Sequence, residues 1–460
     1  MFRRNDDLTL AWRNNETFAK LSHLTEESMK FDPELYTRFN VKRGLRNADG
    51  SGVLVGLTSV GEVHGYVMDE GEAKPVEGRL RYRGMDVRDL VKGFQAEKRF
   101  GFEETAFLLL FGRLPVADEL DNFSQLIAES RDLPEGFKET IVMRAPSKDI
   151  MNKLALSILM SYSYDDDAED LSVPNVLRQC IQLIARFPVM VAYAYHSKLH
   201  YFDGKSLHIH NQEGNHSTAE NFLSLIRPNR DFTPLEAEIL DLALVLHADH
   251  GGGNNSTFAV HVVSSTGTDT YSAISAGVGS LKGPKHGGAN HSVMEMMADI
   301  QKNVGHLENE TELREYLRKI LRKQAFDKSG LIYGMGHAVY SLSDPRAILL
   351  KEKAEELAKE KGRSDEFRLY TEVERLGKEV FQEEKGSKII CANVDFYSGF
   401  VYNMLNIPND VHTPIFAIAR MAGWAAHRIE EVVSGGRIIR PAYKYVQPQQ
   451  DYVPLAQRKI

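Results

Sequence analysis

The sequence has almost no cysteine, since Cys180 and Cys391 are the only thiols among 460 residues. Two thiols cannot form the disulfide framework of a small secreted domain, and they fit a reducing compartment. Residues 1–7 also lack the apolar segment of a secretory signal, and their early aspartates disfavour a transit peptide. We therefore expect a cytoplasmic protein.

Long hydrophobic runs and an excess of one charge are also missing. The most apolar stretch, residues 187–195, falls well short of the roughly 18 residues that a membrane-spanning helix needs. Lys and Arg number 56 against 64 Asp and Glu, which gives a net charge of −8. A general nucleic-acid binder would need a basic face. That class is disfavoured, whereas a few local arginines would suffice to bind a small anion.

What is present is typical of a large helical protein. At 460 residues the chain exceeds the size at which one hydrophobic core stops growing, so we expect two domains. Apolar residues at three- and four-residue spacing predict helices over 102–111 and 150–162. Alternation over 79–83 predicts a small hairpin near the N-terminus. The predicted fold class is mainly α.

Capping signals mark further helix starts. Thr233 with Glu236 forms a capping box around Pro234, and Asp344 precedes Pro345 in the same manner. A helix is also expected to begin near Ser292. Further helices are predicted over 256–264, 269–281, 310–323, 344–361, 365–384 and 421–432.

Four short segments each combine a chemically useful side chain with glycine, proline or asparagine: residues 247–253, 283–290, 334–346 and 393–399. Each has an ordinary structural explanation. His250 can cap a helix C-terminus, and Asp344 can cap a helix N-terminus. Asp395 follows an apolar run, so it either caps a helix or lies in a pocket that shifts its pKa.

The combination of these segments is more informative than any one of them. Arg420 lies in an apolar helical pattern, where its charge would be costly unless it meets an anion. Arginines match carboxylates bidentately, histidines donate hydrogen bonds to carbonyl oxygens, and an aspartate can act as a general base. This set suits chemistry on a polycarboxylate.

The segment 203–217 offers a different possibility, a metal half-site formed by His208 and His210. Glu213 and His216 are close enough in sequence to be further ligands. The spacing matches no metal motif, however, and solvated histidines in a polar loop are the commoner outcome. We expect no metal site.

From residue 53 to the C-terminus the chain resembles the citrate synthase family. The resemblance rests on several motifs in order: 246–250 with 256–258, 283–290, 336–346, 393–399, 414–420 and 437–441. It implies a helical two-domain fold that works as a dimer. The large domain would comprise 53–287 and 408–460, and the small domain 288–407 would close over the substrates, while 1–52 form an N-terminal extension.

The resemblance also implies roles for individual residues. Asp395 would remove a proton from the methyl group of acetyl-CoA. His286 would hydrogen-bond the thioester oxygen as the enolate forms. His337 would polarise the keto group of oxaloacetate and protonate the new alkoxide. Gly334 and Gly336 would lie near the CoA.

Four residues would hold the oxaloacetate: His250, Arg346 and Arg420, with Arg440 contributed across the interface of the homodimer. Water would then cleave the thioester to release citrate and CoA, the entry step of the tricarboxylic acid cycle. CoA is a substrate in this reaction, and no cofactor or metal is implied. Ser341 departs from the family, because some members place an arginine there that binds a CoA phosphate.

Three alternatives stay open at this stage. A 2-methylcitrate synthase would use propionyl-CoA, and one methylene leaves no clear mark in a sequence. A metal-dependent hydrolase could use the same His and Asp residues or the loop of His208. A non-catalytic helical dimer is the third possibility.

Overall fold

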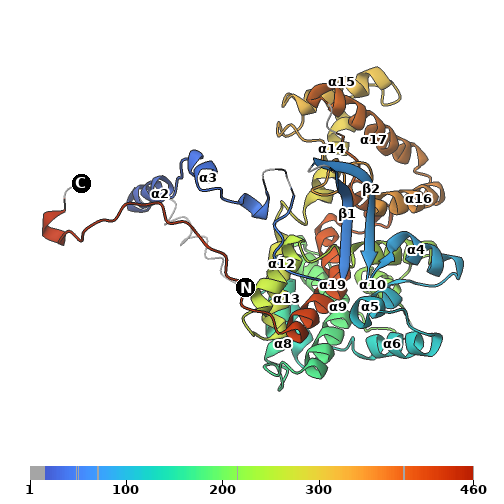
Figure 1. Ribbon diagram of the computed structural model, residues 1–460. Helices are drawn as coiled ribbons and strands as arrows, with labels where there is room; N and C mark the ends of the chain where they lie inside the picture. Colours follow the sequence, from blue (N-terminus) through green and yellow to red (C-terminus); the bar gives the residue numbers. More distant parts are fainter. Residues whose placement is uncertain are drawn as a thin grey trace. The chain divides into compact units, whose positions relative to one another are not determined.

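The computed structural model describes residues 16–47, 49, 51–69, 72–214, 216–386 and 389–458. The chain divides into two compact units, Gly56–Ile439 and the pair of segments Met1–Val55 and Arg440–Ile460. The larger unit is mainly helical, as predicted (Figure 1). Its helices are α4 (Val87–Ala96), α5 (Phe102–Phe111), α6 (Ala117–Glu129), α7 (Phe137–Met143), α8 (Ile150–Tyr162), α9 (Val173–Asp203), α10 (Thr218–Ile226), α11 (Pro234–His247), α12 (Asn255–Ser264), α13 (Thr270–Lys282), α14 (Ala289–Asn303), α15 (Glu310–Leu321), α16 (Pro345–Glu360), α17 (Ser364–Lys385), α18 (Val394–Met404) and α19 (Asn409–Ser434).

The predicted hairpin is confirmed and forms a three-stranded antiparallel sheet. Strand β1 (Gly61–Asp69) pairs with β2 (Glu72–Tyr82), which pairs with the short β3 (Met85–Asp86). The hairpin packs closely on the segment between His337 and Asp344. A Cβ atom at Gly78 would stand 2.1 Å from the carbonyl oxygen of Ser343, and one at Gly65 would stand 2.6 Å from that of Val339. Glycine is therefore required where the sheet touches this segment.

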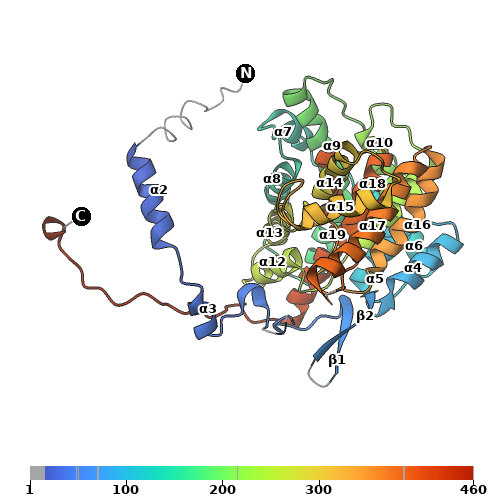
Figure 2. The same cartoon turned by 90° about the horizontal axis from the view of Figure 1, so that it is seen from above.

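Two long helices, α9 and α19, form the centre of the core. They pack against each other, and α19 also contacts α12 and α13 (Figures 1 and 2). The sequence predicted only the second half of α19 and no helix over α9. Their buried residues lie on all sides, so the helical period of apolar residues disappears. Pro188 and Pro414 also lie inside these helices, where proline normally signals an end.

The other predicted helices agree with the structure within three residues, and the largest difference is that α11, expected to run to His250, ends at His247. Thr233 accepts from the amide of Glu236, and Asp269 accepts from that of Ser272. One prediction was wrong, because α14 begins at Ala289 and not near Ser292. Asn290, which was assigned to the preceding turn, is a buried residue of the helix itself.

Helices α14 to α18 form a second group within the larger unit. Helix α15 packs on α17, while α18 contacts both α14 and α16. Figure 1 places α14, α15, α16 and α17 at one end of this unit, and α6 and α8 at the other. Among the described residues, none of the helices is both long and apolar enough to cross a membrane.

The smaller unit contains α2 (Glu16–Ser28), α3 (Glu34–Arg38) and two short 3-10 helices, Arg43–Leu45 and Leu455–Gln457. Its two segments meet where the Lys444 ammonium lies 5.2 Å from the centre of the Phe39 ring. Arg440 belongs to this unit. The first fifteen residues of the expected N-terminal extension lie outside the described residues.

Candidate active site

The loop that carries His337 is joined directly to the segment that carries Asp395. The amide of Gly336 donates to the carbonyl of Cys391 across 2.7 Å, and that of Asn393 donates to the carbonyl of Gly334 across 2.9 Å. Gly334 and Gly336 have φ of +75° and +90°, which favours glycine in both positions. A Cβ at Gly334 would also stand 2.8 Å from the Phe396 side chain. The backbone therefore explains both glycines without any ligand.

His337 has its tautomer set by the backbone. Its Nδ1 accepts hydrogen bonds from the amides of Val339 (3.1 Å) and Tyr340 (3.2 Å). In the neutral ring the proton is therefore on Nε2, which makes this atom a hydrogen-bond donor. The ring stacks on Tyr340 with centroids 4.7 Å apart and meets the His250 ring edge-on at 5.1 Å. His337 is thus a fixed donor beside His250.

Asp395 lies in the first turn of α18. Its backbone amide donates to the side-chain oxygen of Asn393, the N-cap of this helix, across 3.0 Å. Burial raises the pKa of the Asp395 carboxyl to about 6, against the opposing charges of Arg346 and Arg420. A carboxylate with this pKa is a stronger base than a solvated one and is still ionised at pH 7. This is the pocket alternative that the sequence left open.

His286 occupies a tight turn between α13 and α14. Its Nε2 accepts the amide of Ser256 across 3.4 Å and lies 3.1 Å from the Ser256 hydroxyl. The ring proton is therefore on Nδ1. Burial, together with the charge of Arg420, lowers the pKa of His286 to about 4, so the ring is neutral at pH 7. Lys285 beside it is exposed, and nothing in the structure gives that side chain a role.

Arg420 is the most unusual side chain of the group. It is fully buried on α19, and its Nε donates to the carbonyl of His247 across 2.8 Å. Its Nη1 and Nη2, like Nε2 of His250, are buried without a hydrogen-bond partner among the described residues. Burial lowers the pKa of Arg420 to about 10, so the group stays charged at pH 7. Unpaired buried donors of this kind need an anion.

Arg346 is held in a buried ion pair with Asp344. Its Nε and Nη2 donate to the two carboxylate oxygens across 3.0 and 2.7 Å. Asp344 also accepts from the backbone amide of Arg346, so its predicted role as N-cap is confirmed. Burial alone would raise the pKa of Asp344, but Arg346 holds it below its ordinary value. The sequence indicated the cap and missed the ion pair.

Electrostatic coupling shows how close these groups are to one another. The charge of Arg420 acts on His250, His286 and Asp395, and the charge of Arg346 acts on His250 and Asp395. Burial, followed by Arg346 and His337, keeps the pKa of His250 well below its ordinary value. The structure thus gathers six of the seven principal residues that the sequence singled out. The seventh, Arg440, lies in the smaller unit.

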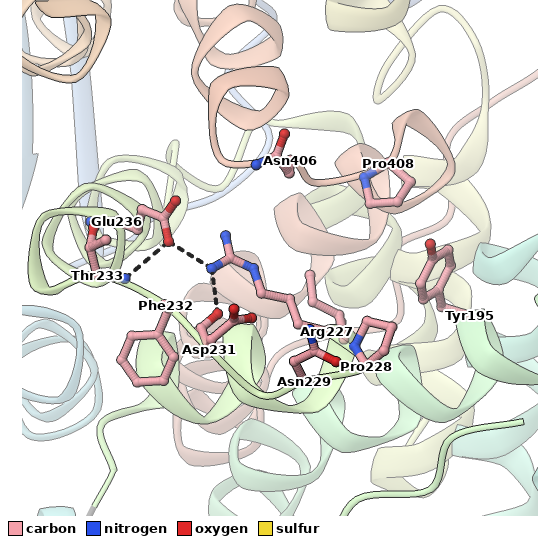
Figure 3. Close-up of a pocket in the computed structure, with 11 residues that line it drawn as sticks. Tyr195, Arg227, Pro228, Asn229, Asp231, Phe232, Thr233, Glu236, Asn406 and Pro408 are labelled. Carbon is pink, nitrogen blue, oxygen red and sulfur yellow. Dashed lines mark hydrogen bonds and ion pairs between the residues drawn. The ribbon is translucent and has the colours of Figure 1, made fainter. Parts of the chain in front are cut away.

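Two other features of the structure differ from this group. The cavity in Figure 3 lies between α10, α11 and the start of α19, and contains Arg227 and Glu236. Arg227 donates to Glu236 across 2.6 Å and to the carbonyl of Leu405, and Lys361 pairs with the other oxygen of Glu236 at 2.7 Å. Both cations are therefore paired with Glu236, whereas the Nη atoms of Arg420 have no partner among the described residues.

The loop of His208 and His210 differs from its expected solvated state. Both side chains are partly buried, and their rings lie 5.8 and 6.1 Å from that of the buried His196. His210 Nε2 lies 3.1 Å from the carbonyl oxygen of Arg227. Glu213 pairs with His216 at 3.1 Å inside the segment, and Arg131 donates to the carbonyl of Glu213 across 3.0 Å, which ties the segment to its surroundings.

Comparison with known proteins agrees with the geometry. Residues 49–442 match the family described as citrate synthase, C-terminal domain. A citrate synthase of Haloferax volcanii is 35% identical over 91% of this chain and 99% of its own length. The structure of citrate synthase from Pyrobaculum aerophilum, 31% identical, superimposes with a TM-score of 0.73 over 89% of this chain and 94% of that one. The citrate synthase of Thermoplasma acidophilum in complex with carboxymethyl coenzyme A and oxaloacetate, 26% identical, gives a TM-score of 0.73 over 91% and 99%. The chain belongs to the citrate synthase family.

Proposed function

We propose that the group around Arg420 carries out the reaction of this family, the condensation of acetyl-CoA with oxaloacetate and hydrolysis of the thioester to citrate and CoA. The chain is an acyltransferase of the citrate synthase type. The observation that supports the residue assignment is that a buried cationic site without hydrogen-bond partners lies near a carboxyl group whose pKa is raised. Arg420 offers two buried donors without partners, Nε2 of His250 is buried and also unpaired, and Asp395 nearby has a pKa raised to about 6.

The first step needs a base and a place for the developing negative charge. A methyl group beside a thioester is a far weaker acid than a carboxylic acid, and each pKa unit of mismatch costs about 1.4 kcal/mol. Asp395 takes the proton, and His286 Nδ1, left as the donor by the Ser256 amide, hydrogen-bonds the thioester oxygen as it becomes an enolate. A neutral imidazole in a buried site can stabilise that charge.

The second step joins the enolate carbon to the keto carbon of oxaloacetate. His337 Nε2 donates to the keto oxygen and delivers a proton to the alkoxide that forms, because its Nδ1 is occupied by backbone amides. Arg420, Arg346 and His250 bind the two carboxylates, and Arg440 joins them across the interface of a homodimer. Water then attacks the thioester, and CoA leaves as the thiol.

Three features of the whole protein belong to the same proposal. Residues 288–407 form a small domain that closes over the substrates and excludes water during bond formation. Residues 53–287 with 408–460 form the large domain and the dimer contact. The enzyme acts in the cytoplasm, at the entry of the tricarboxylic acid cycle.

A thiol-release assay with oxaloacetate tests the activity, with acetyl-CoA and propionyl-CoA compared side by side. We expect the larger kcat/KM with acetyl-CoA. A preference for propionyl-CoA would instead assign 2-methylcitrate synthesis. Thiol release that needs no oxaloacetate, is lost on chelation and is restored by metal would favour a hydrolase, and the absence of thiol release with either acyl-CoA would favour a non-catalytic dimer.

A further inference from the structure

A second group of polar residues lies between α12 and α19, next to the segment that carries His250. It consists of His261 on α12 with His427 and Glu430 on α19, and is called here the His–His–Glu cluster. One ligand atom from each residue lies within 4.8 Å of the other two. His427 and Glu430 are three residues apart on one helix, which places them on the same face. The side chains of His261 and Glu430 are only 12% and 17% exposed, and that of His427 is fully buried.

The outward nitrogens of the two histidines are both occupied by carboxylates. His261 Nδ1 lies 2.8 Å from Oε2 of Glu431, and His427 Nε2 lies 3.1 Å from Oδ1 of Asp249. A carboxylate accepts hydrogen bonds, so these outward nitrogens carry the ring protons. The inward nitrogens, His261 Nε2 and His427 Nδ1, lie 3.1 Å apart, which is a hydrogen-bonding distance, so one of them carries a proton that a bound metal ion would displace.

Glu430 adds a third acceptor to the same point. Its Oε1 accepts from the amide and hydroxyl of Ser59, at 2.7 and 2.9 Å, which fixes the carboxylate. Its Oε2 lies 3.7 Å from His427 Nδ1 and is buried, and no described residue donates a hydrogen bond to it. Gly252 lies against both rings, since a Cβ there would be in van der Waals contact with His261 Nε2 at 3.6 Å. Once the proton between the rings is displaced, three acceptors converge where one cation would satisfy them all.

A proton shared by the two rings would leave Glu430 Oε2 unsatisfied, whereas a metal ion would not. We propose that the His–His–Glu cluster binds one divalent transition-metal ion, with Zn²⁺ as the best match to two imidazoles and a carboxylate. With metal–nitrogen bonds of about 2.05 Å, a nitrogen separation of 3.1 Å corresponds to an angle of about 100° at the metal. Asp249 and Glu431 then take the place of the outer carboxylates that orient metal-binding histidines.

The position of the cluster indicates that a bound ion would stabilise the structure and take no part in the reaction. Asp249 precedes His250, and its Oδ2 accepts the amide of Gly251 across 2.8 Å. Arg420 lies two turns before His427 on the same helix. An ion at the cluster would hold α12, α19 and the turn at 249–251 together. It would therefore help to position His250 and Arg420, which are proposed to bind oxaloacetate. It would touch no reacting atom.

The test uses the full-length protein, freed of metal by chelation and dialysis. Calorimetric titration with Zn²⁺ is expected to give one ion per chain. His261→Gln and Glu430→Gln, made separately, are each expected to weaken binding at least about 10-fold. His208→Gln, in the other histidine group of the chain, is the matched control and should leave the affinity unchanged.

Replacing Zn²⁺ by Co²⁺ tests which residues bind the metal ion without the need for a variant. Two paramagnetically shifted, exchangeable imidazole N–H signals are expected, one from each histidine, because both outward nitrogens are protonated. Absence of stoichiometric binding, absence of these two signals, or an affinity that depends on His208 and not on His261 and Glu430 would overturn the proposal. Circular dichroism of each variant confirms that a lost affinity is not a lost fold, and the Co²⁺ spectrum of the unaltered protein decides the matter if a variant does not fold.

Discussion

The side-chain amide of Asn393 donates a hydrogen bond to the carbonyl oxygen of Gly336 across 2.9 Å. The other end of the same side chain caps α18 by accepting the amide of Asp395. This side chain therefore adds to the two backbone hydrogen bonds that hold the loop of His337 beside the helix of Asp395. The proposed base and the proposed acid act on atoms that must be joined to each other, so their separation has to be held closely.

Asn393→Asp keeps the oxygen that caps α18 and removes the donor to Gly336. The new carboxylate also faces a carbonyl oxygen and repels it. We expect kcat/KM to fall about 100-fold, the usual scale for a displaced catalytic group. Steady-state kinetics of thiol release measures this. Asn403→Asp, on the same helix but bonded to Arg363, should cost little, and equal losses in both variants would contradict the role given to Asn393.

Activity should fall on the acid side of pH 6. Burial raises the pKa of Asp395 to about 6, and the base works only when ionised. Below this pH, kcat/KM for acetyl-CoA should drop about tenfold per pH unit. His286 cannot produce that limb, because burial lowers its pKa to about 4. The residual activity of Asp395→Asn should not fall in this way below pH 6. If the variant showed the same fall, another residue would be the base.

The ionised carboxylate of Asp395 should lower the free energy of unfolding. The folded-state pKa of about 6 lies above the ordinary value of 3.8, so the folded protein binds the proton more tightly than the unfolded chain. The resulting stability is fully present below about pH 3.8 and is lost as pH rises through about 6. Asp395→Asn should therefore raise the free energy of unfolding by about 1–3 kcal/mol at pH 8.

Thermal or denaturant unfolding of the two proteins at several pH values checks this difference. The gain from Asp395→Asn should shrink steadily as the pH is lowered from 8 to 4. A variant that is less stable than the parent at pH 8 would show that the ionised carboxylate makes favourable contacts in the folded state.

The parts of the fold that the sequence predicted are those decided locally. Thr233 and Asp344 cap helices through contacts within three residues, and the hairpin follows from alternation along one short strand. Helix α9 was missed because its burial on nearly every side removes the period on which a prediction depends. The start of α14 was misplaced because Gly288, its N-cap, has no capping side chain to mark it.

The features of the candidate site that could be predicted from the sequence are likewise the local ones. Arg420 could be identified from the sequence, because a charge inside an apolar helical pattern needs an anion wherever the helix lies. The tautomers of His286 and His337 could not, since they depend on the amides of Ser256 and Tyr340. The His–His–Glu cluster was also missed. Its only local signal is the spacing of His427 and Glu430, and His261 joins them from 166 residues away.

Arg420→Lys provides the sharpest test of the anion site. Lysine keeps the charge but cannot present two Nη groups in one plane to a carboxylate. We expect kcat/KM for oxaloacetate to fall at least about 100-fold, in line with the loss of one buried charged contact. The free protein should not lose stability in proportion, because both Nη atoms lack a hydrogen-bond partner among the described residues.

The matched control is Arg428→Lys, which alters another fully buried arginine of α19 whose Nη2 donates to the carbonyl of Thr268 across 2.6 Å. Oxaloacetate should raise the Tm of the unaltered protein and of Arg428→Lys, and should leave that of Arg420→Lys unchanged. Binding of a ligand to the folded state alone stabilises it in proportion to the logarithm of ligand concentration over Kd. An undiminished shift in Arg420→Lys would mean that the unpaired Nη groups face something other than the substrate, and the oxaloacetate site would then have to be built on Arg346 and His250.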